Sequence, residues 1–178
     1  HAARSPDRPA LVHERGVDSV ATFTFGMVQR LANQCANTFE RHLQLQRGDR
    51  VMIYLGQDPA TAVAHVGCWK AGLVSVPTSL LFGTDALEYR LRDSGAKVLI
   101  TDAAHHPTVA AVRDRAPDLQ TVLVTDGTAE HALPFWETLA RASDAYDTLD
   151  LPPDTPAFIN YTSGTTGQPK GALQAHRS

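Results

Sequence analysis

The amino-acid sequence predicts an α/β fold, with an open, mostly parallel β-sheet flanked by helices on both faces (αβα). Two observations support this prediction. Five short runs rich in apolar and β-branched residues are nearly continuous rather than alternating, which is typical of strands buried on both faces. The first four recur about every 22–25 residues, the spacing of strand–helix–strand units. The predicted strands are residues 50–55, 73–76, 97–101, 121–125 and 157–161.

Helix signals fill the gaps between these strands. Residues 26–45 carry one apolar stripe at steps of three and four, with Gly48 just beyond its end. Asp58 and Pro59 predict the N-cap and first turn of a second, mostly apolar helix that ends at Gly72.

Three further segments complete the predicted fold. Thr84 and Asp85 begin a helix that Gly95 ends, and weaker helix signals cover residues 107–116 and 134–142. The acidic, proline-containing segment 143–156 is predicted to be a surface connection. We expect residues 1–178 to form a single α/β domain.

Composition excludes several classes of function. Sixteen Lys and Arg against nineteen Asp and Glu give a formal net charge of −3, so nucleic acid is not an expected partner. No run approaches the roughly 18–20 apolar residues of a membrane span, and the N-terminus lacks the features of a signal peptide. Cys35 and Cys68 lack zinc-ligand spacing. We predict two half-buried thiols in a reducing compartment, and hence a cytoplasmic protein.

One segment, residues 160–171 (NYTSGTTGQPKG), carries the composition of a polyphosphate site. Its glycines allow backbone N–H groups to approach an anion closely. Its hydroxyl groups and its single lysine add donors and a positive charge for phosphate oxygens. It is not a Walker A loop, because Lys170 follows Gly167 by three residues and comes after a proline. Ser163 lacks the Gly-x-Ser-x-Gly context of a hydrolase nucleophile.

Residues 161–171 resemble the phosphate-loop signature of the adenylate-forming enzymes, [YF]-[TS]-S-G-[ST]-T-G-x-P-K-G, at every fixed position. This superfamily includes acyl-CoA synthetases, amino-acid adenylation domains and firefly luciferase. Other segments are similar to motifs of the same superfamily along nearly the whole chain. These are residues 23–25 (FTF, similar to a T-[YF] motif before the first helix), 47–51 (RGDRV), 69–77 (WKAG followed by VP) and 93–97 (DSGAK).

The resemblance implies a two-step reaction, in which a carboxylate and ATP give an acyl-adenylate and pyrophosphate, and coenzyme A then takes the acyl group. It implies ATP, Mg²⁺ and coenzyme A as cofactors of the complete enzyme, and a small carboxylic acid as its substrate. The residues implied to hold the β- and γ-phosphates are Thr162, Ser163, Gly164, Thr165, Thr166, Gly167 and Lys170.

Residues 78–90 are most similar to acyl-CoA synthetases of the medium-chain and aromatic-acid type. Amino-acid adenylation domains usually carry Asp soon after the Val-Pro pair, where this chain has Thr78 and Ser79. A fatty or aromatic acid is therefore favoured over an amino acid, which stays as the alternative within the superfamily.

The resemblance also indicates what this chain lacks. The adenine, ribose and magnesium motifs, the acyl pocket and the C-terminal domain with its catalytic lysine would all follow Gly171. We therefore expect the first part of the large N-terminal domain of such an enzyme, with no catalytic or metal-binding residue of its own and no turnover alone. A non-catalytic phosphate-binding or interaction module with the same fold is the alternative. A truncated sheet could expose an apolar face, so a homo-oligomer is a further expectation.

The histidines and tryptophans have less specific interpretations. His105 and His106 are expected at a solvated helix start rather than at a metal, and His65 is expected to be packed and hydrogen-bonded. His176 follows the predicted phosphate loop by five residues, where family members often carry histidine, and it is a candidate for shaping the site. Trp69 and Trp136 are expected in the core.

Overall fold

The computed structural model describes residues 1–14, 19–162 and 167–177. Within these residues, seven strands form one sheet in the order β7-β6-β5-β3-β4-β8-β9, in which only the β8–β9 pair is antiparallel. The predicted open, mostly parallel sheet is confirmed. Its strands are β3 (Arg50–Ile53), β4 (Val74–Pro77), β5 (Val98–Thr101), β6 (Thr121–Val124), β7 (Leu133–Pro134), β8 (Pro156–Thr162) and β9 (Lys170–Ala175).

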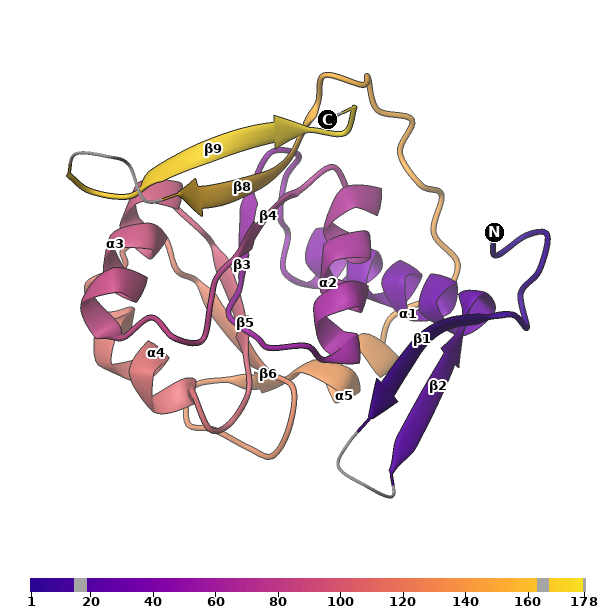
Figure 1. Ribbon diagram of the computed structural model, residues 1–178, viewed down its shortest axis with the longest axis horizontal. Coiled ribbons are helices and arrows are strands. Elements are labelled where there is room, and N and C mark those ends of the chain that lie inside the picture. Colours follow the sequence, from indigo (N-terminus) through magenta and orange to yellow (C-terminus); the bar gives the residue numbers. More distant parts are fainter. Residues whose placement is uncertain (15–18, 163–166, 178) are drawn as a thin grey trace.

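Helices cover both faces of the sheet, as Figure 1 shows. On one face lie α1 (Phe25–Asn37), α2 (Pro59–Lys70) and α5 (Phe135–Ala140), and on the other lie α3 (Thr84–Ser94) and α4 (His106–Arg113). Val51 and Ile53 of β3 pack under the first group, whereas Met52 and Tyr54 pack under the second. This alternation explains why β3 is apolar at successive positions.

The strand order reverses at β3. The chain passes from β3 to the adjacent β4 and then crosses back to β5 on the other side of β3. Because crossovers between parallel strands are right-handed, a change of direction moves the connecting helix to the opposite face. This explains why α2 and α3 lie on opposite faces. In open α/β sheets, ligands bind outside the carboxyl ends of the strands at such a reversal.

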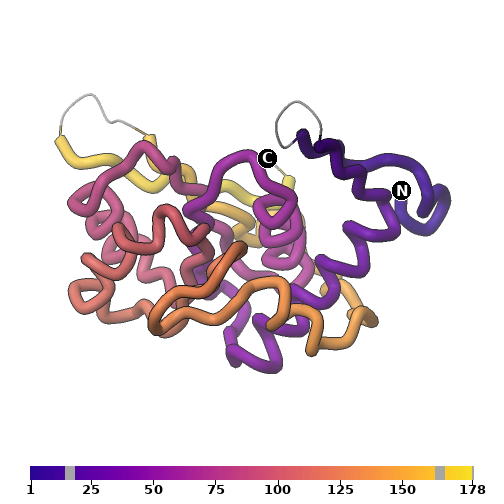
Figure 2. The backbone as a smooth tube through the Cα atoms, turned by 90° about the horizontal axis from the view of Figure 1, so that it is seen from below, coloured from indigo at the N-terminus to yellow at the C-terminus, as the bar shows by residue number. Residues whose placement is uncertain are grey.

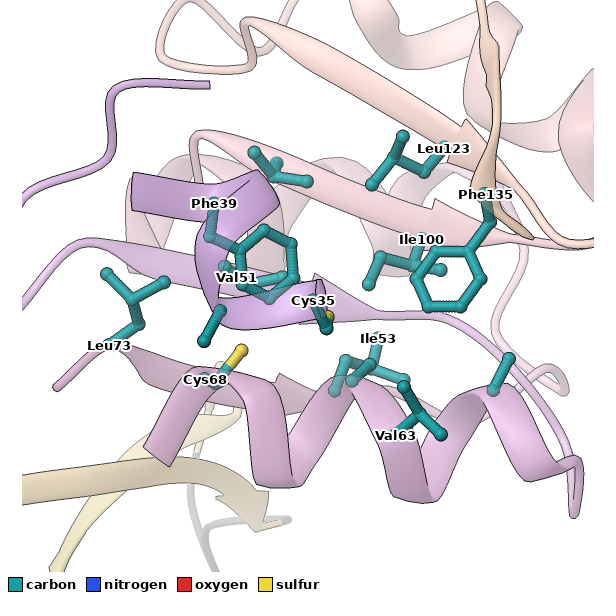
Figure 3. Close-up of a cluster of buried hydrophobic side chains, with 14 of the residues drawn as sticks. Cys35, Phe39, Val51, Ile53, Val63, Cys68, Leu73, Ile100, Leu123 and Phe135 are labelled. Atoms are coloured by element: carbon teal, nitrogen blue, oxygen red, sulfur yellow. The ribbon is translucent and has the colours of Figure 1, made fainter. Parts of the chain in front are cut away.

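The core under α1 and α2 contains both cysteines (Figure 3). Cys35 and Cys68 are fully buried free thiols, so the prediction that they are half-buried was wrong. Burial raises the pKa of both thiols. Their surroundings are apolar side chains such as Phe39 and Val63, and they therefore serve as small core residues.

The first helix differs from its predicted span of 26–45. The α-helix ends at Asn37, and one π-helical turn, η1 (Thr38–His42), follows it. Gln44 has a φ of 55°, so the left-handed conformation that ends the segment comes before Gly48, whose own φ is 83°. The helix begins as expected after Phe23 and Thr24, with the Thr24 hydroxyl accepting a hydrogen bond from the Met27 N–H.

A separate N-terminal hairpin precedes α1. It consists of β1 (Pro9–Glu14) and β2 (Val20–Thr24), which were not among the predicted strands. Figure 2 shows this hairpin at one end of the molecule, with α3 and α4 toward the other. Across the part of the chain that the structure describes, no helix is long and apolar enough to cross a membrane.

Candidate functional site

The predicted phosphate loop lies at the tip of the β8–β9 hairpin. In the register of the hairpin, Thr162 is opposite Lys170 and Tyr161 is opposite Gly171. Tyr161 is a strand residue, as the predicted strand over residues 157–161 requires, and Thr162, Lys170 and Gly171 are paired strand residues as well. Strand pairing fixes residues 161–162 relative to residues 170–171. The sequence of the motif alone did not indicate this pairing.

Three of the predicted phosphate-binding residues are described, and all three are exposed: Thr162, Gly167 and Lys170. Gly167 has a φ of 105°, a conformation that favours glycine. The other four predicted residues lie outside the described residues: Ser163, Gly164, Thr165 and Thr166.

The hairpin has two different faces. Ile159 and Tyr161 pack against the core under α3 and α4. Because side chains alternate along a strand, Thr162 points to the opposite face. Lys170 shares that face, since residues directly opposite in an antiparallel pair project to the same side. The hydroxyl and ammonium groups of the motif therefore lie together, on the face of the sheet covered by α2.

Gly171 is required by the close packing of the hairpin. A Cβ at this position would lie 2.8 Å from Cγ2 of Ile159 and 3.3 Å from Cζ of Tyr161. The Tyr161 ring thus covers the space where a side chain at residue 171 would be. This gives a structural reason for the final glycine of the motif, separate from phosphate binding.

A hollow of about 580 Å³ lies beside the hairpin on the α2 face, at the carboxyl ends of β3 and β4. Asn160 of β8, Thr61 and His65 of α2, and the segment after β4 contribute to its wall. Its lining is Ile53, Leu55, Gly56, Gln57, Thr61, His65, Pro77, Thr78, Ser79, Leu80, Leu81 and Asn160. Thr78 and Ser79 were candidates from their sequence context, but no sequence pattern places them with Asn160.

His65 is half-buried, and its ring contacts two neighbours. Its Nδ1 lies 2.9 Å from Oγ of Ser75, and its ring is 5.6 Å from that of Trp69. Burial lowers the pKa of His65, which keeps the imidazole neutral. The predicted packed, hydrogen-bonded histidine is confirmed, although the same side chain also lines the hollow.

A second hollow, of about 340 Å³, lies where the strand order reverses. Its walls include Asp58 at the start of α2 and Asp102 and Asp126, which follow β5 and β6. Asp102 accepts a hydrogen bond from the backbone N–H of His105, and Asp126 accepts one from the N–H of Ala103. These two carboxylates therefore organise the loops at the strand ends.

The segments resembling family motifs contact one another. The buried carboxylate of Asp49 lies 2.8 Å from Nζ of Lys97 and accepts a hydrogen bond from the Gln46 N–H. The Arg50 guanidinium donates to the carbonyl groups of Ser94 and Gly95. These contacts connect residues 47–51 with residues 93–97 at the start of β3. This is a structural role for both segments.

The remaining candidates lie away from the hairpin tip. Nδ1 of His105 is 2.7 Å from Asp102 at the start of α4, as expected for a helix-start residue. Trp69 and Trp136 are half-buried and pack against the core. His176 follows β9, and its N–H donates to the Thr155 carbonyl at the end of the hairpin opposite the motif. The expectation that His176 helps to shape the site stays a prediction.

The chemistry of the described residues at the hairpin tip fits an anion. Lys170 and Thr162 supply a positive charge and a hydroxyl donor on one face, as phosphate oxygens require. Among residues 1–14, 19–162 and 167–177, no group of three or more His, Cys, Asp and Glu side chains could hold a metal ion. The expectation that this chain contributes no metal ligands of its own stays a prediction.

The family model for AMP-binding enzymes matches residues 1–178. The chain belongs to this family. It is 32% identical over 174 residues to the acyl-coenzyme A synthetase ACSM4 of Rattus norvegicus, covering 97% of this chain and 30% of that protein. It is 33% identical over 170 residues to human acyl-coenzyme A synthetase ACSM5, covering 95% of this chain and 29% of that protein. The chain therefore spans less than a third of the length of these relatives.

Solved structures of AMP-binding enzymes have the same fold as this chain. The anthranilate CoA ligase AuaEII, in complex with anthranoyl-AMP, is 27% identical with a TM-score of 0.88, covering 99% of this chain and 34% of that one. Acetoacetyl-CoA synthetase from Streptomyces lividans is 28% identical with a TM-score of 0.88, covering 99% and 29%. These matches confirm the predicted fold as that of the N-terminal domain of adenylate-forming enzymes. Both mammalian relatives are named mitochondrial, so a cytoplasmic location remains a prediction.

Proposed function

We propose that this chain is the N-terminal part of an AMP-forming acyl-CoA synthetase and holds the β- and γ-phosphates of ATP. The observation that carries the proposal is the paired hairpin, which sets Lys170 and Thr162 side by side at the two ends of the signature sequence. The match of the family model to the whole chain supports it. The residues proposed to hold the phosphates are Thr162, Ser163, Gly164, Thr165, Thr166, Gly167 and Lys170.

In the proposed first step, a carboxylate oxygen of the substrate attacks the α-phosphorus of ATP. The bond between this phosphorus and the bridging oxygen breaks, and pyrophosphate leaves with the electron pair. Lys170 and the hydroxyl groups around it would stabilise the charge that accumulates on the leaving group. We expect Mg²⁺ to reach the site with the nucleotide, bound to its phosphates. In the second step, the thiol sulfur of coenzyme A forms a bond with the acyl carbon, AMP leaves, and the thiol proton passes to a base.

A fatty or aromatic carboxylic acid is the proposed substrate. Two kinds of relative support this class, acyl-coenzyme A synthetases among the curated proteins and an anthranilate CoA ligase among the solved structures. An amino acid is the alternative that the same assay would reveal.

The test is pyrophosphate exchange into ATP by the protein that contains this chain, with medium-chain, aromatic and amino acids offered separately. We expect exchange with a fatty or aromatic acid, about a 100-fold lower rate in Lys170→Ala, and no exchange by residues 1–178 alone. The matched control is Arg177→Ala, which removes a positive charge paired with Asp154 at the other end of the hairpin region. No exchange with any acid would favour a non-catalytic module, whereas exchange that does not depend on an added acid would contradict a carboxylate as the attacking group.

Self-association remains a separate prediction. Within the described chain, β9 is an edge strand of the large sheet, and Leu173 on it is 59% exposed. A second copy could cover this edge. Sedimentation velocity over a range of concentrations tests the prediction, and a monomer at every concentration would contradict it.

A further inference from the structure

Helix α3 contacts both arms of the β8–β9 hairpin. The Tyr161 hydroxyl, on β8, donates to the Asp93 carboxylate at 2.6 Å. The Tyr89 hydroxyl donates to the backbone carbonyl of Pro169, just before β9, at 2.8 Å. Tyr89 and Asp93 are four residues apart and so lie on one face of the helix. The two hydrogen bonds therefore reach the chain on either side of residues 163–166.

Ring contacts strengthen this attachment. The rings of Tyr89 and Tyr161 meet edge-on with centroids 6.4 Å apart. The guanidinium carbon of Arg90 lies 3.8 Å from the centroid of the Phe82 ring and 5.3 Å from that of Tyr161. Arg90 is only 5% exposed. A buried guanidinium beside two rings gains cation–π attraction, which partly offsets the loss of its hydration.

Tyr89 and Asp93 act on the hairpin from the face opposite its proposed ligand. Tyr161 points toward α3, whereas Thr162 and Lys170 project to the other face of the sheet. The hollow beside α3 is also unsuited to phosphate, because the guanidinium of Arg92 in its wall is outnumbered by three carboxylates, those of Asp85, Glu88 and Asp93. Any effect of α3 on phosphate binding must therefore pass through the backbone of the hairpin.

We propose that Tyr89 and Asp93 of α3 are positioning residues for the phosphate-binding hairpin, and that they set its affinity for the pyrophosphate portion of ATP. The inference rests on the proposed function. Held at Tyr161 and Pro169, the two arms keep Thr162 and Lys170 in place before a ligand arrives. A pre-ordered site loses less conformational entropy on binding, so removing the attachments weakens affinity without removing a ligand contact.

The resemblance pattern accepts either Tyr or Phe at the first position of the motif, so the Tyr161 hydroxyl is not required by the signature. This makes Tyr161→Phe an informative variant, because it keeps the ring and its contacts and removes one hydrogen bond. Tyr89→Phe does the same at the other arm. Tyr146→Phe is the matched control, because it removes a hydroxyl that donates to a different carboxylate, Glu40, away from the hairpin.

The experiment measures the dissociation constant of inorganic pyrophosphate for the 178-residue chain by calorimetry. We expect about a threefold loss of affinity in each of Tyr89→Phe and Tyr161→Phe, about tenfold in the double variant, and no change in Tyr146→Phe. In the ligand-free chain, the amide signals of Gly167 and Gly171 should shift in the hairpin variants and stay in place in the control. Circular dichroism confirms that each variant is folded.

A second pair of variants separates positioning from general stability. Asp93→Asn keeps an acceptor for the Tyr161 hydroxyl and should retain affinity, whereas Asp93→Ala should reproduce the loss seen in Tyr161→Phe. In the complete enzyme, the hairpin variants should raise KM for ATP and leave KM for the acid unchanged. Unchanged pyrophosphate affinity in the double variant would overturn this inference alone. A folded wild-type chain that does not bind pyrophosphate would overturn the proposed function and, with it, the inference.

Discussion

Gly67 of α2 lies directly against Cys35 of α1. A Cβ at residue 67 would be 2.7 Å from both Cβ and Sγ of Cys35, closer than real Cβ atoms approach. The two helices thus meet here with no room for a side chain on α2. Both residues are buried, and Cys35 belongs to the core on the α1–α2 face of the sheet (Figure 3).

Gly67→Ala should destabilise the protein, although alanine normally stabilises the middle of a helix by about 0.5–1 kcal/mol relative to glycine. The overlap with Cys35 would force the two helices apart, at an expected net cost of about 1–3 kcal/mol. Urea unfolding at constant pH measures the change. Gly56→Ala is the control, since a Cβ there would meet only Cδ1 of Leu80, at an ordinary contact distance of 3.5 Å. A Gly67→Ala protein as stable as the wild type would contradict the close packing of α1 on α2.

Asn37 holds the segment that connects α5 to β8. Its buried side-chain amide donates to the carbonyl groups of Ser143 and Ala145, at 2.7 and 2.9 Å. Asn37→Asp keeps the shape but places a carboxylate against two carbonyl oxygens, so we expect a loss of at least about 2 kcal/mol. Gln44→Glu adds the same charge at an exposed position and should change little. Equal free energies of unfolding for the two variants would exclude this role of Asn37.

His65 should make stability depend on pH below neutrality. Burial lowers its pKa below the usual 6.5, so the unfolded chain binds a proton more readily than the folded one. The stability that the neutral His65 contributes is therefore fully present above about pH 6.5 and is lost as the pH falls through the lowered pKa of the folded protein. The free energy of unfolding, measured in urea between pH 7.5 and 5, should therefore decrease as the pH falls. His65→Gln should reduce this slope, whereas His42→Gln, at an exposed position, should keep it. A slope that His65→Gln leaves unchanged would assign the pH dependence to other groups.

The central sheet was predictable because its strands are buried on both faces. Residues such as Val51, Met52 and Ile53 are all apolar, and alternate ones serve different cores. The ends of α2 and α3 were predictable for a local reason, since Asp58 caps one helix and Gly95, with a φ of 58°, ends the other. These signals depend only on neighbouring residues.

The two hairpins were not predictable in the same way. The sequence of β9 (KGALQA) has little intrinsic strand preference, and it becomes a strand by pairing with β8. In β1 and β2, Val12 and Val20 are about 60% exposed, so no buried face marks these strands. The attachment of Tyr89 to Pro169 joins residues 80 positions apart, and no local pattern reveals such a contact.

The most direct test of the proposed function is an amide spectrum of the glycine-labelled chain, titrated with pyrophosphate and then with Mg-ATP. We predict shifts at Gly164, Gly167 and Gly171, none at the distant Gly48 and Gly127, and loss of the effect in Lys170→Ala. A folded chain whose motif glycines do not respond to either ligand would contradict the claim that this hairpin holds the phosphates of ATP.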